Sequence, residues 1–337
     1  MVDQPTLTAQ LAPGLTPERI LRRLEWQVIR RLDGRLQGDY RTVFRGTGVD
    51  VVDLREYQPG DDLRHIDWNV TARTDIPHVR EYLEDRELTA WLLLDRSPSM
   101  RFGPIERRKH VVLTELAATV AQLLSRGGNR IGAVLFDTKV DEVVAPASGR
   151  NQVLRILSRL LQAPGLDASA GTTARGSSAR RTPARGTAAR QATARQITDR
   201  QTTALAVPLR ATLGIARRRS LIVIISDFIT EPGWEQALAQ LAHRHDVVAI
   251  QVVDRREFEL PAVGMIYVED AETGEQIFVD SNDPAFQQRL RAAADERQAT
   301  LTATTRTAGV DLFTVSTDED LVRALARIAE LRRRRRR

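Results

Sequence analysis

The sequence contains no cysteine, and this absence removes several kinds of chemistry. Disulfides, thiol nucleophiles and thiolate-bound zinc all require cysteine, so they are excluded. The strongly apolar runs, such as LIVII at 221–225, are far shorter than the roughly 20 residues of a membrane-spanning helix. The first residues, MVDQPTLTAQLAPGLTPERI, lack the basic start and apolar block of a secretory signal. We therefore expect a soluble, cytoplasmic protein with no membrane span.

Signatures of three enzyme classes are also missing. No Gly-x4-Gly-Lys-[Ser/Thr] segment occurs, so the chain carries no phosphate-binding loop for ATP. No Gly-x-Ser-x-Gly elbow of a serine hydrolase occurs, and none of the five histidines stands where it would serve as the base. An aspartyl-phosphate enzyme built on Asp95 would carry a second aspartate at the position of Ser97.

Basic charge is concentrated in two stretches. The formal net charge is +6, yet segment 165–201 alone carries +5 and the run 332–337 carries +6. The remainder of the chain is therefore mildly acidic. Neither stretch has interleaved aromatic residues on which bases could stack, so we do not expect a nucleic-acid partner. The Ala, Arg, Thr, Gly and Ser composition predicts a disordered insertion at about 165–200, and residues 331–337 a basic tail.

Outside the insertion, buried-strand patterns alternate with helical patterns, which is typical of a doubly wound α/β domain with a mainly parallel sheet. We expect this domain to span 88–330, with a hairpin across EDAETGE at 269–275. The expected strands are 88–95, 130–136, 139–145, 220–227, 246–253 and 311–315, and the expected helices are 106–126, 150–161, 203–216, 233–244, 283–300 and one from 318.

Two of the expected strands end in aspartate. LLLD ends at Asp95, with Ser97 and Ser99 two and four residues further on, and IISD ends at Asp227. The carboxyl ends of such strands open on the crevice where doubly wound sheets bind ligands. Carboxylate and hydroxyl oxygens suit Mg²⁺ or Mn²⁺, and Mg²⁺ keeps several waters, so few protein ligands are needed. A simpler interpretation remains open, in which Ser97 or Ser99 only caps the next helix.

Two motifs and one longer block resemble known families. DRSPSM and ISDF together resemble the von Willebrand factor type A fold, whose Asp-x-Ser-x-Ser, Thr and Asp loops form a metal-ion-dependent adhesion site. The block FRGTGVDVVDLREYQPGDDLRHIDWNVTARTDIPHVREYLEDREL, 44–88, closely resembles the bacterial family called domain of unknown function 58. Together the resemblances cover about 30–160 and 200–320. They imply the metal ligands Asp95, Ser97, Ser99, Thr203 and Asp227, with Thr198 as the alternative threonine.

The family resemblance also implies a function. Its members are thought to act with a ring-forming AAA+ ATPase of the MoxR type, as binding or chaperone-like partners. We therefore expect a non-enzymatic, metal-dependent protein-binding module with such an ATPase and an acidic client as partners. The alternative is a metal-dependent hydrolase acting on a phosphate or ester. It is disfavoured because the only candidate bases in the cluster are the two aspartates that the metal would occupy.

Residues 1–87 are expected to form an N-terminal helix and a β-rich extension. Within it, the segment RHIDWNVTAR alternates acidic, aromatic and basic side chains. Arg64, Asp67, Trp68 and Arg73 could form ion pairs that clamp this extension to the sheet, or they could present a partner-binding surface.

Overall fold

The structure of the protein is a computed structural model. It describes residues 16–25, 28, 30, 53–59, 61, 63, 66–81, 88–104, 107–162, 204–269 and 276–336. Arg64, Thr198, Thr203 and the predicted insertion at about 165–200 lie outside the described residues.

The centre of the molecule is a six-stranded sheet in the order β10-β7-β6-β3-β4-β5. Strand β5 is antiparallel to its neighbour, whereas the other strands run parallel. The expected α/β architecture with a mainly parallel sheet is therefore confirmed, and the sheet is mixed because of its edge strand. The bounds are β3 (Thr89–Asp95), β4 (Arg130–Phe136), β5 (Val140–Ala147), β6 (Leu221–Ser226), β7 (Asp246–Val253) and β10 (Asp311–Ser316).

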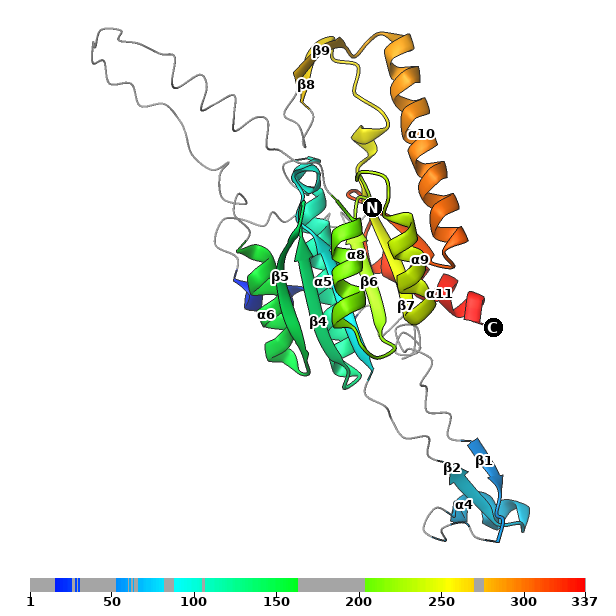
Figure 1. Cartoon of the computed structure of the whole chain (residues 1–337). Coiled ribbons are helices and arrows are strands. Elements are labelled where there is room, and N and C mark those ends of the chain that lie inside the picture. Colours follow the sequence, from blue (N-terminus) through cyan, green and yellow to red (C-terminus); the bar gives the residue numbers. More distant parts are fainter. Residues whose placement is uncertain are drawn as a thin grey trace, which may run out of the picture.

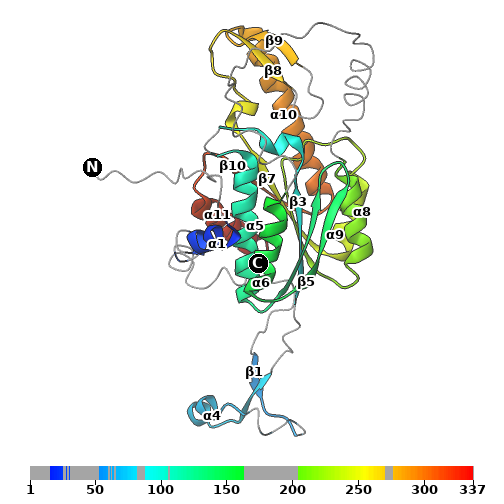
Figure 2. The ribbon, with the colours of Figure 1, turned by 90° about the vertical axis from the view of Figure 1, so that its left-hand side faces the viewer.

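Helices cover both faces of this sheet (Figures 1 and 2). Side chains alternate between the two faces of a strand. In β3, Leu92 and Leu94 therefore pack into one core, and Trp91 and Leu93 pack into the other. Because both faces are buried, β6 reads as the continuous apolar run LIVII. The first core takes residues from α1 (Pro17–Leu24), α5 (Lys109–Arg126), α6 (Arg150–Leu161) and α11 (Leu321–Arg336), and the second from α9 (Glu235–Arg244), α8 (Ala206–Ile215) and α10 (Pro284–Thr307).

The direction of the chain through the sheet reverses between β3 and β6. From β3 the chain proceeds to β4 and β5 on one side, and from β6 it proceeds to β7 and β10 on the other. Leu94 of β3 lies opposite Ile225 of β6, so the residues that follow these strands leave the sheet side by side. Doubly wound sheets bind their ligands at this kind of reversal, outside the carboxyl ends of the strands.

Two small antiparallel pairs stand outside the central sheet. Strands β1 (Asp53–Glu56) and β2 (His78–Glu81), together with α4 (Trp68–Thr74), lie apart from it, beyond the amino ends of its strands (Figures 1 and 2). The hairpin β8 (Met265–Glu269) and β9 (Gln276–Asp280) lies beyond the carboxyl ends and matches the hairpin that the sequence predicts.

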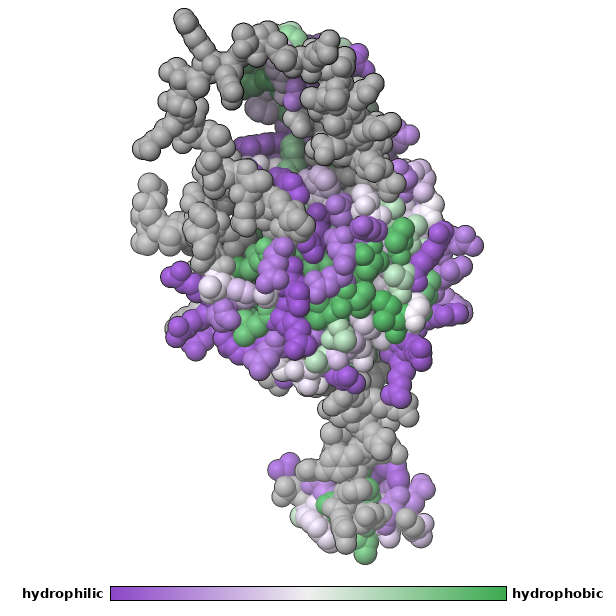
Figure 3. Space-filling view, turned by 60° about the vertical axis from the view of Figure 1, so that its left-hand side comes forward, coloured by the Kyte–Doolittle hydropathy of each residue, from purple (hydrophilic) through white to green (hydrophobic). Residues whose placement is uncertain are grey.

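Figure 3 shows one face of the body, on which apolar residues form an area bordered by hydrophilic residues. Large apolar side chains are exposed at Val143 of β5 and at Val207 and Ile215 of α8. Among the described helices, none is long and apolar enough to cross a membrane.

The C-terminal arginine run begins inside the fold. Helix α11 continues to Arg336, and Arg332 is only 1% exposed. Its Nη2 donates to Asp246 Oδ2 at 2.5 Å, at the start of β7. The predicted tail at 331–337 is therefore in part a buried, ion-paired end of the last helix.

Replacing Arg332 by Met is expected to destabilise the fold, because it leaves the carboxylate of Asp246 without its buried cation. Asp246 keeps partial access to water, so we expect a loss of about 1–3 kcal/mol, below the range for a fully buried pair. Chemical denaturation of Arg332→Met and of Arg334→Met, whose side chain is 71% exposed, provides the comparison. Equal midpoints for the two variants would contradict this prediction.

Candidate functional site

The loop after β3 brings one carboxylate and two hydroxyls together. Asp95 Oδ1 accepts the backbone N–H of Ser97 at 2.9 Å, and Ser97 Oγ lies 3.0 Å from Ser99 Oγ. Pro98 begins the short 3₁₀ helix η3 (Pro98–Arg101), but the Ser97 side chain makes no capping hydrogen bond to it. All three polar side chains are buried. The interpretation of Ser97 as only a helix cap therefore fails.

The loop after β6 supplies the second carboxylate and a link to the first. Ser226 Oγ donates to Asp95 Oδ2 at 2.5 Å and accepts the N–H of Phe228 at 2.9 Å. Asp227 Oδ1 accepts the N–H of Ile229 at 3.0 Å. Phe228 has a φ of 59°, a left-handed conformation that is unfavourable for an aromatic residue. Its ring packs against Trp234 with centroids 6.0 Å apart, which anchors this turn.

The carboxyl groups of Asp95 and Asp227 influence each other through the protein interior. Asp95 is 1% exposed and Asp227 is 4% exposed. Burial, and then the negative charge of Asp227, raise the pKa of Asp95 to about 7, against the hydrogen bonds from Ser226 and Ser97 that lower it. Near neutral pH, Asp95 is therefore readily protonated when no cation is bound beside it.

A buried lysine occupies the other side of Asp227. Lys109, at the start of α5, is 0% exposed, and its Nζ donates to Asp227 Oδ2 at 2.6 Å and to Glu257 Oε1 at 2.5 Å. Although burial alone would lower it, the two carboxylates hold the pKa of Lys109 above its usual value. Lys109 is therefore an internal counter-ion of the site.

A lysine, and not an arginine, fits between Asp227 and Glu257 at position 109. The chain contains 50 Lys and Arg residues, and the printed sequence shows that only Lys109 and Lys139 among them are lysines. An ammonium group is a compact charge that fits between two carboxylates, whereas a guanidinium group is larger and planar.

Lys109 was not among the residues predicted from the sequence, although a signal was present. Lys109 precedes Leu113 by four residues and therefore lies on the buried face of α5.

Glu257 is held in place by a capping box on the 3₁₀ helix η4 (Arg255–Glu257). Asp254 accepts the N–H of Arg256 at 2.9 Å, and Glu257 Oε2 accepts the N–H of Asp254 at 3.1 Å. One Glu257 oxygen thus fixes the loop after β7 while the other binds Lys109. The spacing of Asp254 and Glu257 is the sequence signature of a capping box, but no pattern in the sequence indicated the bond to Lys109.

The geometry of the loop after β3 is compatible with a divalent ion. Neighbouring ligand atoms in an octahedral Mg²⁺ site with bonds of about 2.0–2.1 Å lie about 3 Å apart, and the two hydroxyl oxygens of Ser97 and Ser99 are 3.0 Å apart. Within the described part of the chain, no group of three or more His, Cys, Asp or Glu side chains gathers closely enough to hold a metal ion alone. An ion here would therefore depend on hydroxyls and water as well as on Asp95 and Asp227.

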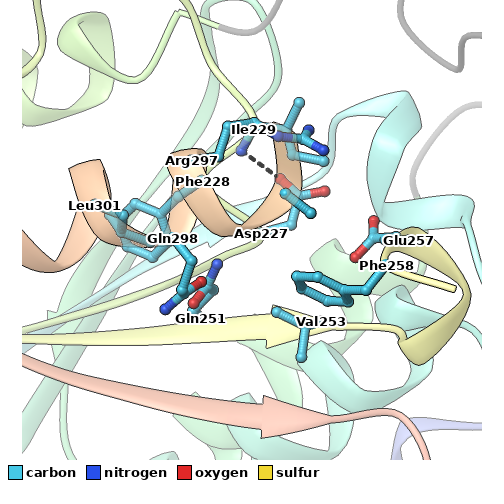
Figure 4. Close-up of a pocket in the computed structure, with 11 residues that line it drawn as sticks. Asp227, Phe228, Ile229, Gln251, Val253, Glu257, Phe258, Arg297, Gln298 and Leu301 are labelled. Atoms are coloured by element: carbon cyan, nitrogen blue, oxygen red, sulfur yellow. Dashed lines mark hydrogen bonds between the residues drawn. The ribbon is translucent and has the colours of Figure 1, made fainter. Parts of the chain in front are cut away.

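Open cavities lie on both sides of this cluster. One, of about 430 Å³, borders Asp227, Glu257 and residues of α10 that include Arg297 and Gln298 (Figure 4). The other, of about 370 Å³, is lined by Asp95, Ser97 and His110 among others. Burial, and then the charge of Arg108, lower the pKa of His110 to about 4, so this imidazole is neutral near pH 7.

The structure brings together four of the five predicted metal ligands, Asp95, Ser97, Ser99 and Asp227. The fifth, Thr203, and its alternative Thr198 lie outside the described residues, as does Arg64 of the predicted partner-binding set. The other three members of that set belong to the separate β1–β2–α4 unit. Asp67 is buried and caps α4 by accepting the N–H of Val70, whereas Trp68 is 69% exposed and Arg73 lies in the last turn of α4.

A family model described as "Protein of unknown function DUF58" matches residues 53–300. The chain belongs to this family. A bacterial relative, an "Uncharacterized protein" of Mycobacterium bovis, is 36% identical over 336 residues, which is 99% of this chain and 92% of the relative. A relative from Mycobacterium tuberculosis (strain ATCC 25618 / H37Rv) has the same identity and coverage.

Two solved structures are similar to the chain, but with lower sequence identity than these relatives. The conserved hypothetical protein BatB from Bacteroides thetaiotaomicron has 14% identity and a TM-score of 0.40, over 72% of this chain and 99% of its own. An aerotolerance-related membrane protein from Bacteroides fragilis has 14% identity and a TM-score of 0.42, over 73% and 99%.

Proposed function

We propose that the chain is a non-enzymatic, metal-dependent protein-binding module with a von Willebrand factor A-like domain. In this proposal Asp95, Ser97, Ser99 and Asp227, with Thr203 as the fifth ligand, hold Mg²⁺ or Mn²⁺ in a metal-ion-dependent adhesion site. The observation that carries it is the pair of hydroxyls beside Asp95, joined through Ser226 to the loop of Asp227, at the reversal of the sheet.

The hydrogen bonds that Asp95 and Asp227 already accept support an ion that is held partly through water. Both oxygens of Asp95 and both oxygens of Asp227 already accept a hydrogen bond from the protein. Each oxygen retains a further lone pair, which a coordinated water can donate to. The bound ion would supply positive charge and an exchangeable position for a carboxylate from the client.

One arginine beside the site can pair with an acidic client. Arg297 lines the same cavity as Asp227, and α10 places it at the carboxyl end of the sheet (Figure 4). A guanidinium group can pair with a carboxylate that approaches Asp227 from this side. The family resemblance implies an ATPase of the MoxR type as the second partner, and we propose that it works with this chain in a chaperone-like or assembly role.

Calorimetric titration with Mg²⁺ and Mn²⁺ tests the metal site directly. We expect the wild-type chain to bind one ion and Asp95→Ala to lose measurable binding, because the variant removes a charge next to the hydroxyl pair. Asp295→Ala, at an exposed position of α10, is the matched control and should bind as the wild type does. Equal binding by Asp95→Ala would refute the site.

Binding of a purified MoxR-type ATPase with and without a chelator then tests the partner.

One observation favours a second function, a metal-dependent hydrolase acting on a phosphate or ester. Contrary to the expectation from the sequence, His110 shares a cavity with Asp95 and Ser97, and its Nδ1 has no hydrogen-bond partner. It therefore lies where a base would be needed, but its lowered pKa makes it a weak base. Hydrolysis of p-nitrophenyl esters or phosphates that requires Mg²⁺ and is lost in His110→Gln would favour this function over binding alone.

A further inference from the structure

The hairpin β8–β9 exposes more apolar surface than a solvated hairpin needs. Four of its residues are more than half exposed, namely Met265 58%, Tyr267 72%, Ile277 55% and Phe278 51%, and so is Val263 just before β8, at 65%. Two-stranded hairpins are only marginally stable in water, and contiguous exposed apolar surface on a folded protein marks an interaction site. We refer to residues 263–269 and 276–281 as the arm.

An aromatic pair forms the centre of one face of the arm. Tyr267 and Phe278 are directly opposite each other in the two strands, and their ring centroids are 4.7 Å apart. Met265 and Asp280, the next pair on the same face, continue this surface toward the body. The face therefore offers aromatic rings with a carboxylate beside them.

The arm is firmly attached at its base. Ser281 is 0% exposed, and its Oγ accepts the N–H of Val263 at 3.0 Å and donates to the carbonyl of Gly264 at 2.8 Å. Gln287 of α10 donates to the carbonyl of Ser281 at 2.7 Å. The arm thus projects from the start of α10 beyond the carboxyl end of the sheet (Figure 1), and its exposed rings are presented in a fixed direction.

The charge of this region determines what can bind. The described residues of the arm carry two carboxylates, Glu269 and Asp280, and no lysine or arginine. Nucleic acids and anionic membrane surfaces are repelled by such a stretch, whereas a basic polypeptide is attracted. Arginine fits better than lysine, because a guanidinium group can stack on an aromatic ring while it pairs with a neighbouring carboxylate.

We propose that the arm is a docking surface for an arginine-bearing segment of a partner protein. The guanidinium groups stack on the Tyr267–Phe278 pair, and the acidic residues of the arm neutralise them. This inference does not depend on the proposed metal site, because no residue of the arm belongs to that cluster.

The test uses the full chain and a fluorescein-labelled decapeptide that alternates arginine with alanine, with lysine and glutamate versions for comparison. By fluorescence anisotropy we expect the arginine peptide to bind most tightly and the glutamate peptide not to bind. The double variant Tyr267→Ser, Phe278→Ser should bind the arginine peptide about fivefold to tenfold more weakly, as expected when cation–π contacts are lost. Val207→Ser, at an exposed apolar position outside the arm, should bind as the wild type does.

Several outcomes would overturn the proposal. Equal affinity of the wild type and the double variant would show that only general charge attraction is involved. Sedimentation of the wild type as a dimer that the double variant does not form would identify a second copy as the occupant. Stronger peptide binding after deletion of 166–197 would identify the chain's own Arg-rich stretch. Binding of anionic phosphatidylglycerol vesicles that the double variant loses would identify a membrane.

Discussion

Replacing Lys109 by Met is expected to lower the free energy of unfolding by about 3–5 kcal/mol, the usual loss when one member of a buried ion pair is removed. Lys109 and Asp227 are almost fully buried, so water cannot replace the ammonium group that Asp227 and Glu257 lose. Met keeps the length and the apolar stem of the side chain, which limits the change to the charge. Guanidinium unfolding in the presence of a chelator measures the effect.

A divalent ion should recover part of this loss, because it supplies positive charge close to Asp227. At an ion concentration of 100 times its Kd, the gain from binding is about 2.7 kcal/mol. We expect Mg²⁺ to stabilise Lys109→Met more than it stabilises the wild type. Lys139→Met, at the other lysine and in an exposed position, is the control and should be nearly neutral. If Lys109→Met unfolds like Lys139→Met, Lys109 is not the counter-ion of the site.

The fold could be predicted because its signals are local. Each of the parallel strands β3, β6 and β7 is a run of apolar residues that is buried on both faces, and such runs are recognisable without knowing their partners. The juxtaposition of Asp95 and Asp227 followed from a general property of doubly wound sheets, in which strand ends share one edge. Local pattern and sheet geometry were therefore sufficient to place four of the proposed ligands at the same edge of the sheet.

The buried ion pairs depend on contacts between distant segments. Lys109 is separated by 118 residues from Asp227 and by 148 residues from Glu257. Arg332 is separated by 86 residues from Asp246. A charged residue within a basic or mixed segment is normally solvated, so its sequence neighbours do not reveal that it is buried.

The C-terminal end of helix α10 also depends on tertiary contacts that the local sequence does not show. The sequence predicts a helix over 283–300, but α10 continues through a threonine-rich segment to Thr307. Threonine is a poor helix former, which favours an earlier end. In the structure, Thr302 and Thr305 donate their hydroxyls to the carbonyls of Gln298 and Leu301, and Leu301 packs into the second core. Tertiary packing therefore outweighs the local preference.

Without a divalent ion, ionisation of Asp95 is expected to destabilise the fold as the pH rises from about 4 to about 7. An aspartate in the unfolded chain has a pKa of about 3.9, whereas the pKa of Asp95 in the folded chain is raised to about 7. Between these values the folded chain holds the proton and the unfolded chain releases it, so increasing pH favours unfolding. Three pKa units correspond to a loss of up to about 4 kcal/mol, which is complete above pH 7.

His110 acts in the opposite direction over part of this range, so the wild-type curve alone cannot isolate Asp95. The lowered pKa of His110, about 4, makes the folded chain lose stability as the pH falls below about 6.5.

The informative quantity is therefore the difference in unfolding free energy between the wild type and Asp95→Asn, which cannot ionise at this position. In a chelator we expect the wild type to lose stability relative to Asp95→Asn between pH 4 and 7. With saturating Mg²⁺ the difference should shrink or reverse, because the ion stabilises the ionised carboxylate that the variant lacks. Parallel curves in the chelator would show that Asp95 ionises normally, and an unchanged difference with Mg²⁺ would show that the ion binds elsewhere or not at all.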